Sequence, residues 1–127
     1  MPDHSLADCR ILVVEDAYFI ADDIGTALRG AGAVVVGPAP NGHIALSLLS
    51  SERVDAAVLD INLNGETVYS VADTLRARGK PFVFASGYAK SSIPEAYRDI
   101  ALLEKPGDWR RLIAVLPTLI AKARAGA

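Results

Sequence analysis

Polar side chains stand where four buried strands are expected to end. Because the carboxyl ends of parallel strands share one edge of a sheet, where ligands bind, these side chains are expected to lie together. Three carboxylates, one hydroxyl and one ammonium group in one place suit a hard cation and a phosphoryl group. The residues are Glu15 and Asp16 after the apolar run 11–14, Asp60 after 56–59, Ser86 after 82–85, and Lys105 shortly after 100–103.

The acidic residues carry the donor atoms that Mg²⁺ prefers. This ion takes oxygen ligands in octahedral geometry and is usually bound by one or two carboxylates and a phosphate. Asp16 and Asp60 would supply two oxygens, and Glu15 would reach the ion through water. The backbone carbonyl of Asn62 would supply a further ligand. The cation would offset the repulsion among the carboxylates and between Asp60 and an incoming phosphoryl group.

The same edge of the sheet suits phosphoryl transfer. A carboxylate can act as a nucleophile and form an aspartyl phosphate, and the transfer depends mainly on positioning and on charge stabilisation. Lys105 offers a point charge for a phosphoryl oxygen. The Ser86 hydroxyl and the amide of Gly87 would each donate a hydrogen bond, and glycine lets the backbone approach closely.

Short apolar runs alternate with helix-patterned stretches along the chain, which predicts an α/β domain. The fold class expected is a doubly wound, five-stranded parallel sheet of order 2-1-3-4-5 with helices on both faces. In that order the acidic residues of strands one and three meet at the switch point. Strands are expected at 10–14, 33–37, 56–60, 81–85 and 101–104, and helices at 17–31, 42–50, 66–78 and 108–124.

Local signals support these elements to different degrees. Phe19, Ile24 and Leu28 are expected on the inward stripe of the first helix. Asn41 is a good N-cap for the second helix, and 61–65 is rich in turn formers. The stretch 87–99 is interrupted by a proline and has poor apolar spacing, which predicts a short or mobile fourth helix.

Length and composition limit the class of protein. The chain has 127 residues, enough for one domain, and its 51% apolar and 22% charged residues are ordinary for a globular protein. A net charge of −2 argues against non-specific binding of nucleic acid. Cys9 has no partner for a disulfide, and the sequence contains neither a membrane-spanning run nor a signal peptide. A cytoplasmic location is therefore expected.

Four motifs together resemble a two-component response-regulator receiver domain over almost the whole chain. Each is weak alone, but all four occur in order, each at the end of its strand. The resemblance implies Asp60 as phosphoacceptor, Glu15 and Asp16 as the Mg²⁺ pocket, Ser86 as the switch hydroxyl and Lys105 as the phosphate-binding lysine, with a cis peptide between Lys105 and Pro106. The motifs are Val13-Val14-Glu15-Asp16, Leu59-Asp60-Ile61-Asn62-Leu63, Ser86-Gly87 and Lys105-Pro106.

One position departs from the family pattern. Receivers usually carry an aromatic switch residue three positions before the lysine, where this chain has Leu102. The segment 81–88, with Phe84-Ala85-Ser86-Gly87-Tyr88, resembles a receiver subfamily with a Phe-Ala-Thr/Ser-Gly-aromatic signature, associated with histidine kinases of the HWE or HisKA_2 type. Tyr88 is a candidate to take over the aromatic role or to shield the phosphate from water. In that subfamily the fourth helix is often poorly ordered.

The sequence thus predicts one receiver domain over 1–127 without an effector domain, a phosphoacceptor signalling protein rather than an enzyme. It would take a phosphoryl group from a histidine kinase or phosphotransfer protein and act through contact with a downstream protein. An aspartate-nucleophile phosphatase would need a second acid where Asn62 stands, and a flavodoxin relative would need a phosphate loop where Glu15 and Asp16 stand. A receiver fold used as a constitutive binding module remains an alternative.

Overall fold

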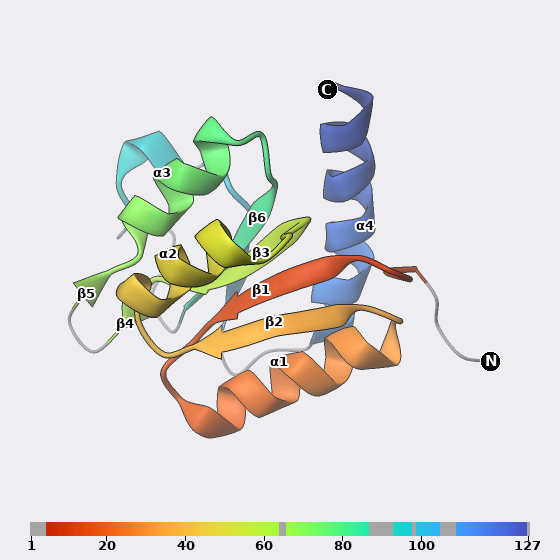
Figure 1. Cartoon of the computed structure of the whole chain (residues 1–127), viewed down its shortest axis with the longest axis horizontal. Helices are drawn as coiled ribbons and strands as arrows, with labels where there is room; N and C mark the ends of the chain where they lie inside the picture. Colours follow the sequence, from red (N-terminus) through yellow and green to blue (C-terminus); the bar gives the residue numbers. More distant parts are fainter. Residues whose placement is uncertain (1–4, 64–65, 87–92, 98, 105–108, 127) are drawn as a thin grey trace.

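A five-stranded parallel sheet forms the centre of the molecule (Figure 1). The computed structural model describes residues 5–63, 66–86, 93–97, 99–104 and 109–126. Within these residues the strand order is β2-β1-β3-β6-β7, which confirms the predicted order 2-1-3-4-5. The strands are β1 (Arg10–Val14), β2 (Val34–Ala39), β3 (Ala56–Asp60), β6 (Phe82–Ser86) and β7 (Leu102–Glu104).

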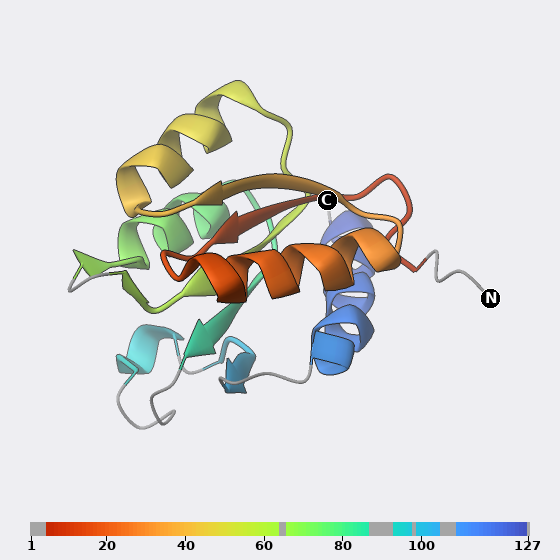
Figure 2. The ribbon, with the colours of Figure 1, turned by 90° about the horizontal axis from the view of Figure 1, so that it is seen from below.

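Helices cover both faces of this sheet (Figures 1 and 2). Helices α1 (Tyr18–Gly30) and α4 (Trp109–Ala125) share one apolar core with the sheet. Helices α2 (Gly42–Ser51) and α3 (Tyr69–Ala77) share the other. Because both faces are covered, the central strands are apolar on both sides, and every residue of β3 and β6 is buried.

Strand β2 runs two residues further than the predicted 33–37, through Pro38 to Ala39. The ladder to β1 shifts register between Leu12 and Val14 and resumes with Val14 opposite Ala39. Gly37 makes this possible because its φ is +100° and an added Cβ would lie 2.8 Å from the amide nitrogen of Ala39. The glycine therefore lets the strand continue past an irregularity that looked like a loop in the sequence.

The third helix begins later than predicted. A short antiparallel pair, β4 (Asn62–Leu63) and β5 (Glu66–Thr67), occupies the expected loop and the first residues of the expected helix. Helix α3 starts at Tyr69, and its inward residues are buried. These residues are Val71, Ala72 and Leu75. The prediction failed because turn formers also suit a tight hairpin.

The other helical signals have mixed outcomes. Asn41 caps α2 as predicted, its side chain accepting a hydrogen bond of 2.9 Å from the amide of Ile44. Phe19, expected on the inward stripe of α1, is 82% exposed instead. The buried stripe passes through Ala21, and Phe19 lies two residues, about 200°, around the helix from it. Of the stretch 87–99, the described part contains one short 3₁₀ turn, η2 (Glu95–Tyr97), and the remainder lies outside the described residues.

Candidate functional site

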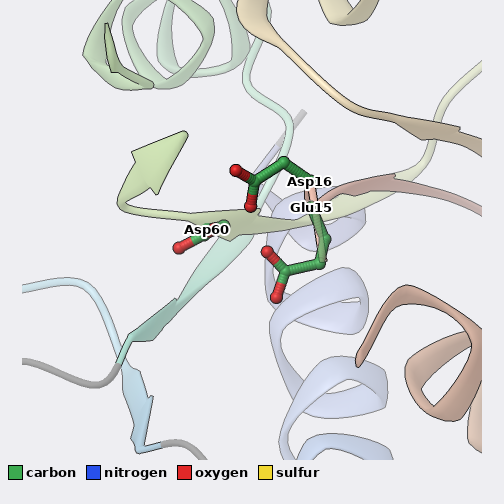
Figure 3. Close-up of side chains that lie close together, drawn as sticks. All are labelled: Glu15, Asp16 and Asp60. Carbon is green, nitrogen blue, oxygen red and sulfur yellow. The ribbon is translucent and has the colours of Figure 1, made fainter. Parts of the chain in front are cut away.

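The three predicted acidic residues meet at the carboxyl ends of β1 and β3 (Figure 3). One carboxylate oxygen from each of Glu15, Asp16 and Asp60 lies within 4.8 Å of the others. Glu15 and Asp60 are 3% and 6% exposed, and Asp16 is partly exposed. Two buried carboxylates beside a third that reaches solvent form an acidic cluster.

Local backbone contacts hold these side chains in place. The amide of Glu15 donates a hydrogen bond of 3.0 Å to the carbonyl of Ala39, so the extension of β2 fixes the end of β1. Asp60 is the last residue of β3 and stands opposite Ala85 in β6. The amide of Ile61 donates to the Ala85 carbonyl at 3.3 Å, which keeps the chain in the sheet just past Asp60.

Ser86 ends the strand beside Asp60. It follows Ala85, the register partner of Asp60, and is 1% exposed. Strand β3 lies between β1 and β6, so Asp60 has the acidic pair Glu15 and Asp16 on one side and Ser86 on the other. This is the arrangement predicted from the ends of the first three apolar runs, while Lys105, expected after the fourth, lies outside the described residues.

The other predicted site residues have different outcomes. Asn62 lies in β4, two residues past Asp60. Leu102 lies in β7 opposite Phe84 and is partly buried against the core. Gly87, Tyr88, Lys105 and Pro106, with the predicted cis peptide, lie outside the described residues.

The donor set fits Mg²⁺. This ion takes oxygen ligands, and proteins commonly bind it through one or two carboxylates together with a phosphate. Two buried carboxylates close to a third also repel one another in a medium of low dielectric, and a divalent cation would remove that repulsion. Glu15, Asp16 and Asp60 are thus the residues that would hold the ion.

The arrangement of two pairs of aromatic residues was not predicted from the sequence. Tyr18 and Phe19, which follow the acidic pair, are 75% and 82% exposed and pair edge to face with 5.7 Å between ring centroids. In the second pair, Tyr97 of η2 packs on Tyr69 of α3. The pairing of residues 28 positions apart leaves no local pattern that could have revealed it.

Comparison with known proteins identifies the class. The response regulator receiver domain matches residues 11–116, and the chain belongs to this family. Receivers are signalling phosphoacceptors of two-component systems rather than enzymes, they bind Mg²⁺, and they work with histidine kinases. Among the described residues, no helix has the length and apolar composition to cross a membrane.

Particular relatives agree with this assignment. The solution structure of SdrG from Sphingomonas melonis Fr1 is 34% identical, with a TM-score of 0.78 over 92% of this chain and 98% of that one. The response regulator PhyR from Brucella abortus gives a TM-score of 0.81 over 95% of this chain and 51% of that one, at 24% identity, and so supports the fold. The transcriptional regulatory protein PdtaR of Mycobacterium tuberculosis is 25% identical over 119 residues, 91% of this chain but 58% of that protein.

Proposed function

We propose that this chain is a phosphorylation-controlled receiver in which Asp60 accepts the phosphoryl group. The observation that carries the proposal is the group of three carboxylates at the ends of β1 and β3, within 4.8 Å of one another. Asp60 is the member on the central strand β3, between the acidic pair and Ser86. It therefore stands where both a cation and a hydroxyl can assist the same phosphoryl group.

The transfer that this geometry favours is a displacement at phosphorus. A carboxylate oxygen of Asp60 attacks the phosphorus of a phosphohistidine, so that a P–O bond forms and the P–N bond breaks. The electron pair of the broken bond stays on the imidazole nitrogen, which then takes up a proton. Attack of water on the phosphorus of the aspartyl phosphate breaks the new P–O bond, releases inorganic phosphate and restores the carboxylate.

Neighbouring groups have separate roles in this proposal. Glu15, Asp16 and the backbone carbonyl of Asn62 join Asp60 in holding Mg²⁺, whose charge offsets that of the transferred group. The Ser86 hydroxyl and the Gly87 amide donate hydrogen bonds to the phosphoryl oxygens. Ser86 is 1% exposed at the end of β6, the strand next to that of Asp60, which supports this role.

Three residues outside the described part of the chain complete the phosphoryl site in this proposal. The ammonium group of Lys105 binds a phosphoryl oxygen, and a cis peptide to Pro106 directs the chain after β7. Tyr88 is proposed to shield the phosphate from water in place of the aromatic side chain that Leu102 lacks. The sequence motifs Ser86-Gly87-Tyr88 and Lys105-Pro106 support these assignments.

The partner proposed is a sensor histidine kinase, of the HWE or HisKA_2 type, or a phosphotransfer protein. The signature Phe84-Ala85-Ser86-Gly87-Tyr88 supports this choice. A downstream protein would then bind the surface of the receiver in one of its two states. Use of the fold as a constitutive binding module is the alternative, and the cluster of three carboxylates argues against it because contact alone needs no such cluster.

Phosphorylation with a small donor tests the proposal directly. The full chain is incubated with acetyl phosphate in Mg²⁺ and in excess chelator, and its intact mass is measured. We expect a single phosphoryl adduct with Mg²⁺ and a loss of at least about 100-fold in rate without it, because the ion offsets the charge at the reacting group. Borohydride reduction should then convert Asp60 to homoserine in the peptide map.

Two outcomes would contradict the proposal. An adduct that maps to a residue other than Asp60 would reject the assigned phosphoacceptor. No adduct with acetyl phosphate, and none with a histidine kinase active on another receiver, would favour the constitutive binding module.

The exposed aromatic pair predicts a difference between protein and small-molecule donors. A protein that brings a phosphohistidine to Asp60 must approach the end of β1, where Tyr18 and Phe19 stand 75% and 82% exposed. Changing both to serine should slow transfer from a kinase that phosphorylates the wild type by roughly tenfold, since exposed aromatic residues are frequent binding hot spots. The rate with acetyl phosphate should stay unchanged.

Val34→Ser is the matched control for this variant. Val34 is also apolar and 45% exposed, but it begins β2 at the opposite end of the sheet. Equal losses in the two variants, or an equal loss with acetyl phosphate, would show that the aromatic pair does not contact the donor protein.

A further inference from the structure

In the described part of the segment between β6 and β7, Tyr97 packs against α3. Tyr97 of η2 stacks on Tyr69 of α3, with 4.6 Å between ring centroids and 22° between the planes. The ring centroid of Tyr97 also lies 6.1 Å from that of Phe84, in an edge-to-face arrangement. The centroids of Tyr69 and Phe84 are 6.0 Å apart in a similar arrangement. Three aromatic rings thus connect η2, α3 and β6 in one cluster.

Polar contacts close this connection at the surface. The Tyr97 hydroxyl donates a hydrogen bond to the Asp73 carboxylate. The guanidinium of Arg76 lies 5.3 Å from the centre of the Tyr97 ring, and it donates to the Ala96 carbonyl at 3.0 Å and to Asp99 at 2.8 Å. The hydrogen bond to Asp73, with partial burial, raises the pKa of the Tyr97 hydroxyl above its ordinary value. We call this set of contacts the Tyr97 latch.

The latch is joined to the phosphorylation site through β6. Phe84 and Ser86 are two residues apart in one strand, so their side chains point to the same face of the sheet. Phe84 also pairs with Leu102, which begins β7 three residues before Lys105. A movement of Ser86 toward a phosphoryl group on Asp60 would therefore shift the strand that carries Phe84, against which Tyr97 packs.

The contacts of the latch are numerous but individually weak. Asp99 is 72% exposed and Arg76 38% exposed, so their ion pair is screened by solvent. In the described part of the segment, regular structure is limited to the three residues of η2. An element held in this way can adopt two states, because a small displacement of one ring removes several contacts together.

We propose that the Tyr97 latch is closed when Asp60 is unphosphorylated and opens when Asp60 is phosphorylated. Tyr97 then acts as the aromatic switch of this chain, a role that Leu102 lacks the ring to perform. Opening would uncover the half-buried ring of Tyr69 and release the exposed side chains of Asp73 and Arg76 from their contacts with the segment. The inference rests on the proposed function, since it assigns a consequence to phosphorylation of Asp60.

Hydrogen–deuterium exchange measures the state of the latch. The amides of Tyr97 and Ile100 donate hydrogen bonds within the segment, to the carbonyls of Pro94 and Tyr97. In the full chain treated with acetyl phosphate and Mg²⁺, these amides should exchange about tenfold faster than in the untreated chain, because local opening exposes them. Intact mass on the same sample reports the extent of phosphorylation.

Variants separate a switch from a merely structural contact. Tyr97→Leu removes the ring and should raise the exchange rate of the unphosphorylated chain to that of the phosphorylated chain. Less than about a twofold difference between the two rates should then remain. Tyr97→Phe keeps the ring and should restore part of that difference. Val34→Ala, which trims an exposed side chain at the start of β2, is the control and should keep the full difference.

The two proposals fail in distinguishable ways. An adduct on Asp60 with unchanged exchange at Tyr97 and Ile100 would overturn the latch and leave the phosphoacceptor in place. Absence of any adduct from small or protein donors would overturn both. A wild-type difference that persists in Tyr97→Leu would also reject Tyr97 as the switch.

Discussion

Changing Asp60 to asparagine is expected to abolish the phosphoryl adduct completely. The amide side chain has nearly the same shape but lacks the carboxylate that attacks phosphorus, so no acyl phosphate can form at that position. Intact mass after incubation with acetyl phosphate and Mg²⁺ measures the loss. Asp23→Asn, an identical change at an exposed position on α1, should leave the yield unchanged.

The same variant should not unfold more easily than the wild type. Asp60 lies within 4.8 Å of two other carboxylates and is 6% exposed, so neutralising it removes its repulsion with these two groups when Mg²⁺ is absent. Neutralising it should stabilise the metal-free protein by on the order of 1 kcal/mol, as is common when a residue is kept for function. A lower melting temperature for Asp60→Asn in chelator would show that Asp60 instead has a structural role.

The sequence predicted the sheet because the relevant information is local. Runs such as 11–14 and 82–85 are apolar on both sides, which happens when helices cover both faces. The site followed from the sheet, since Glu15, Asp16 and Asp60 needed no more than the strand order to be placed together. For the same reason Ser86 was expected beside Asp60 before any contact was known.

The errors arose where non-local contacts decide the conformation. Strand β2 continues to Ala39 because Gly37 bridges a register shift that only the partner strand β1 reveals. Phe19 stands five residues before Ile24, about 140° around the helix from it, and packing against the sheet excludes it from the buried stripe. Tyr97 meets Tyr69 and Asp73 across a change of element, so no periodicity in the sequence could pair them.

Changing Phe84 to alanine is expected to have the largest effect on stability. Phe84 is fully buried, pairs with Leu59 and Leu102 in the neighbouring strands, and meets the rings of Tyr69, Phe82 and Tyr97. Its removal leaves a cavity between β6 and α3 that these rings cannot fill without losing their own contacts. The expected loss is about 3–5 kcal/mol in the free energy of unfolding, measured by urea denaturation.

Phe19→Ala makes the same chemical change at a ring that is 82% exposed, and it should alter stability by no more than about 0.5 kcal/mol. Similar losses in the two variants would mean that the aromatic cluster does not hold β6 against α3.

Phe84→Leu keeps most of the volume of the side chain and should cost less than about 1.5 kcal/mol in the free energy of unfolding, so that the folded protein remains available for study. Because leucine lacks the ring edge that Tyr97 meets, this variant should still be phosphorylated on Asp60 while its latch is already partly open. One substitution would then open the latch without a large loss of stability, since stability depends on the volume of the side chain at position 84 and the latch depends on its shape.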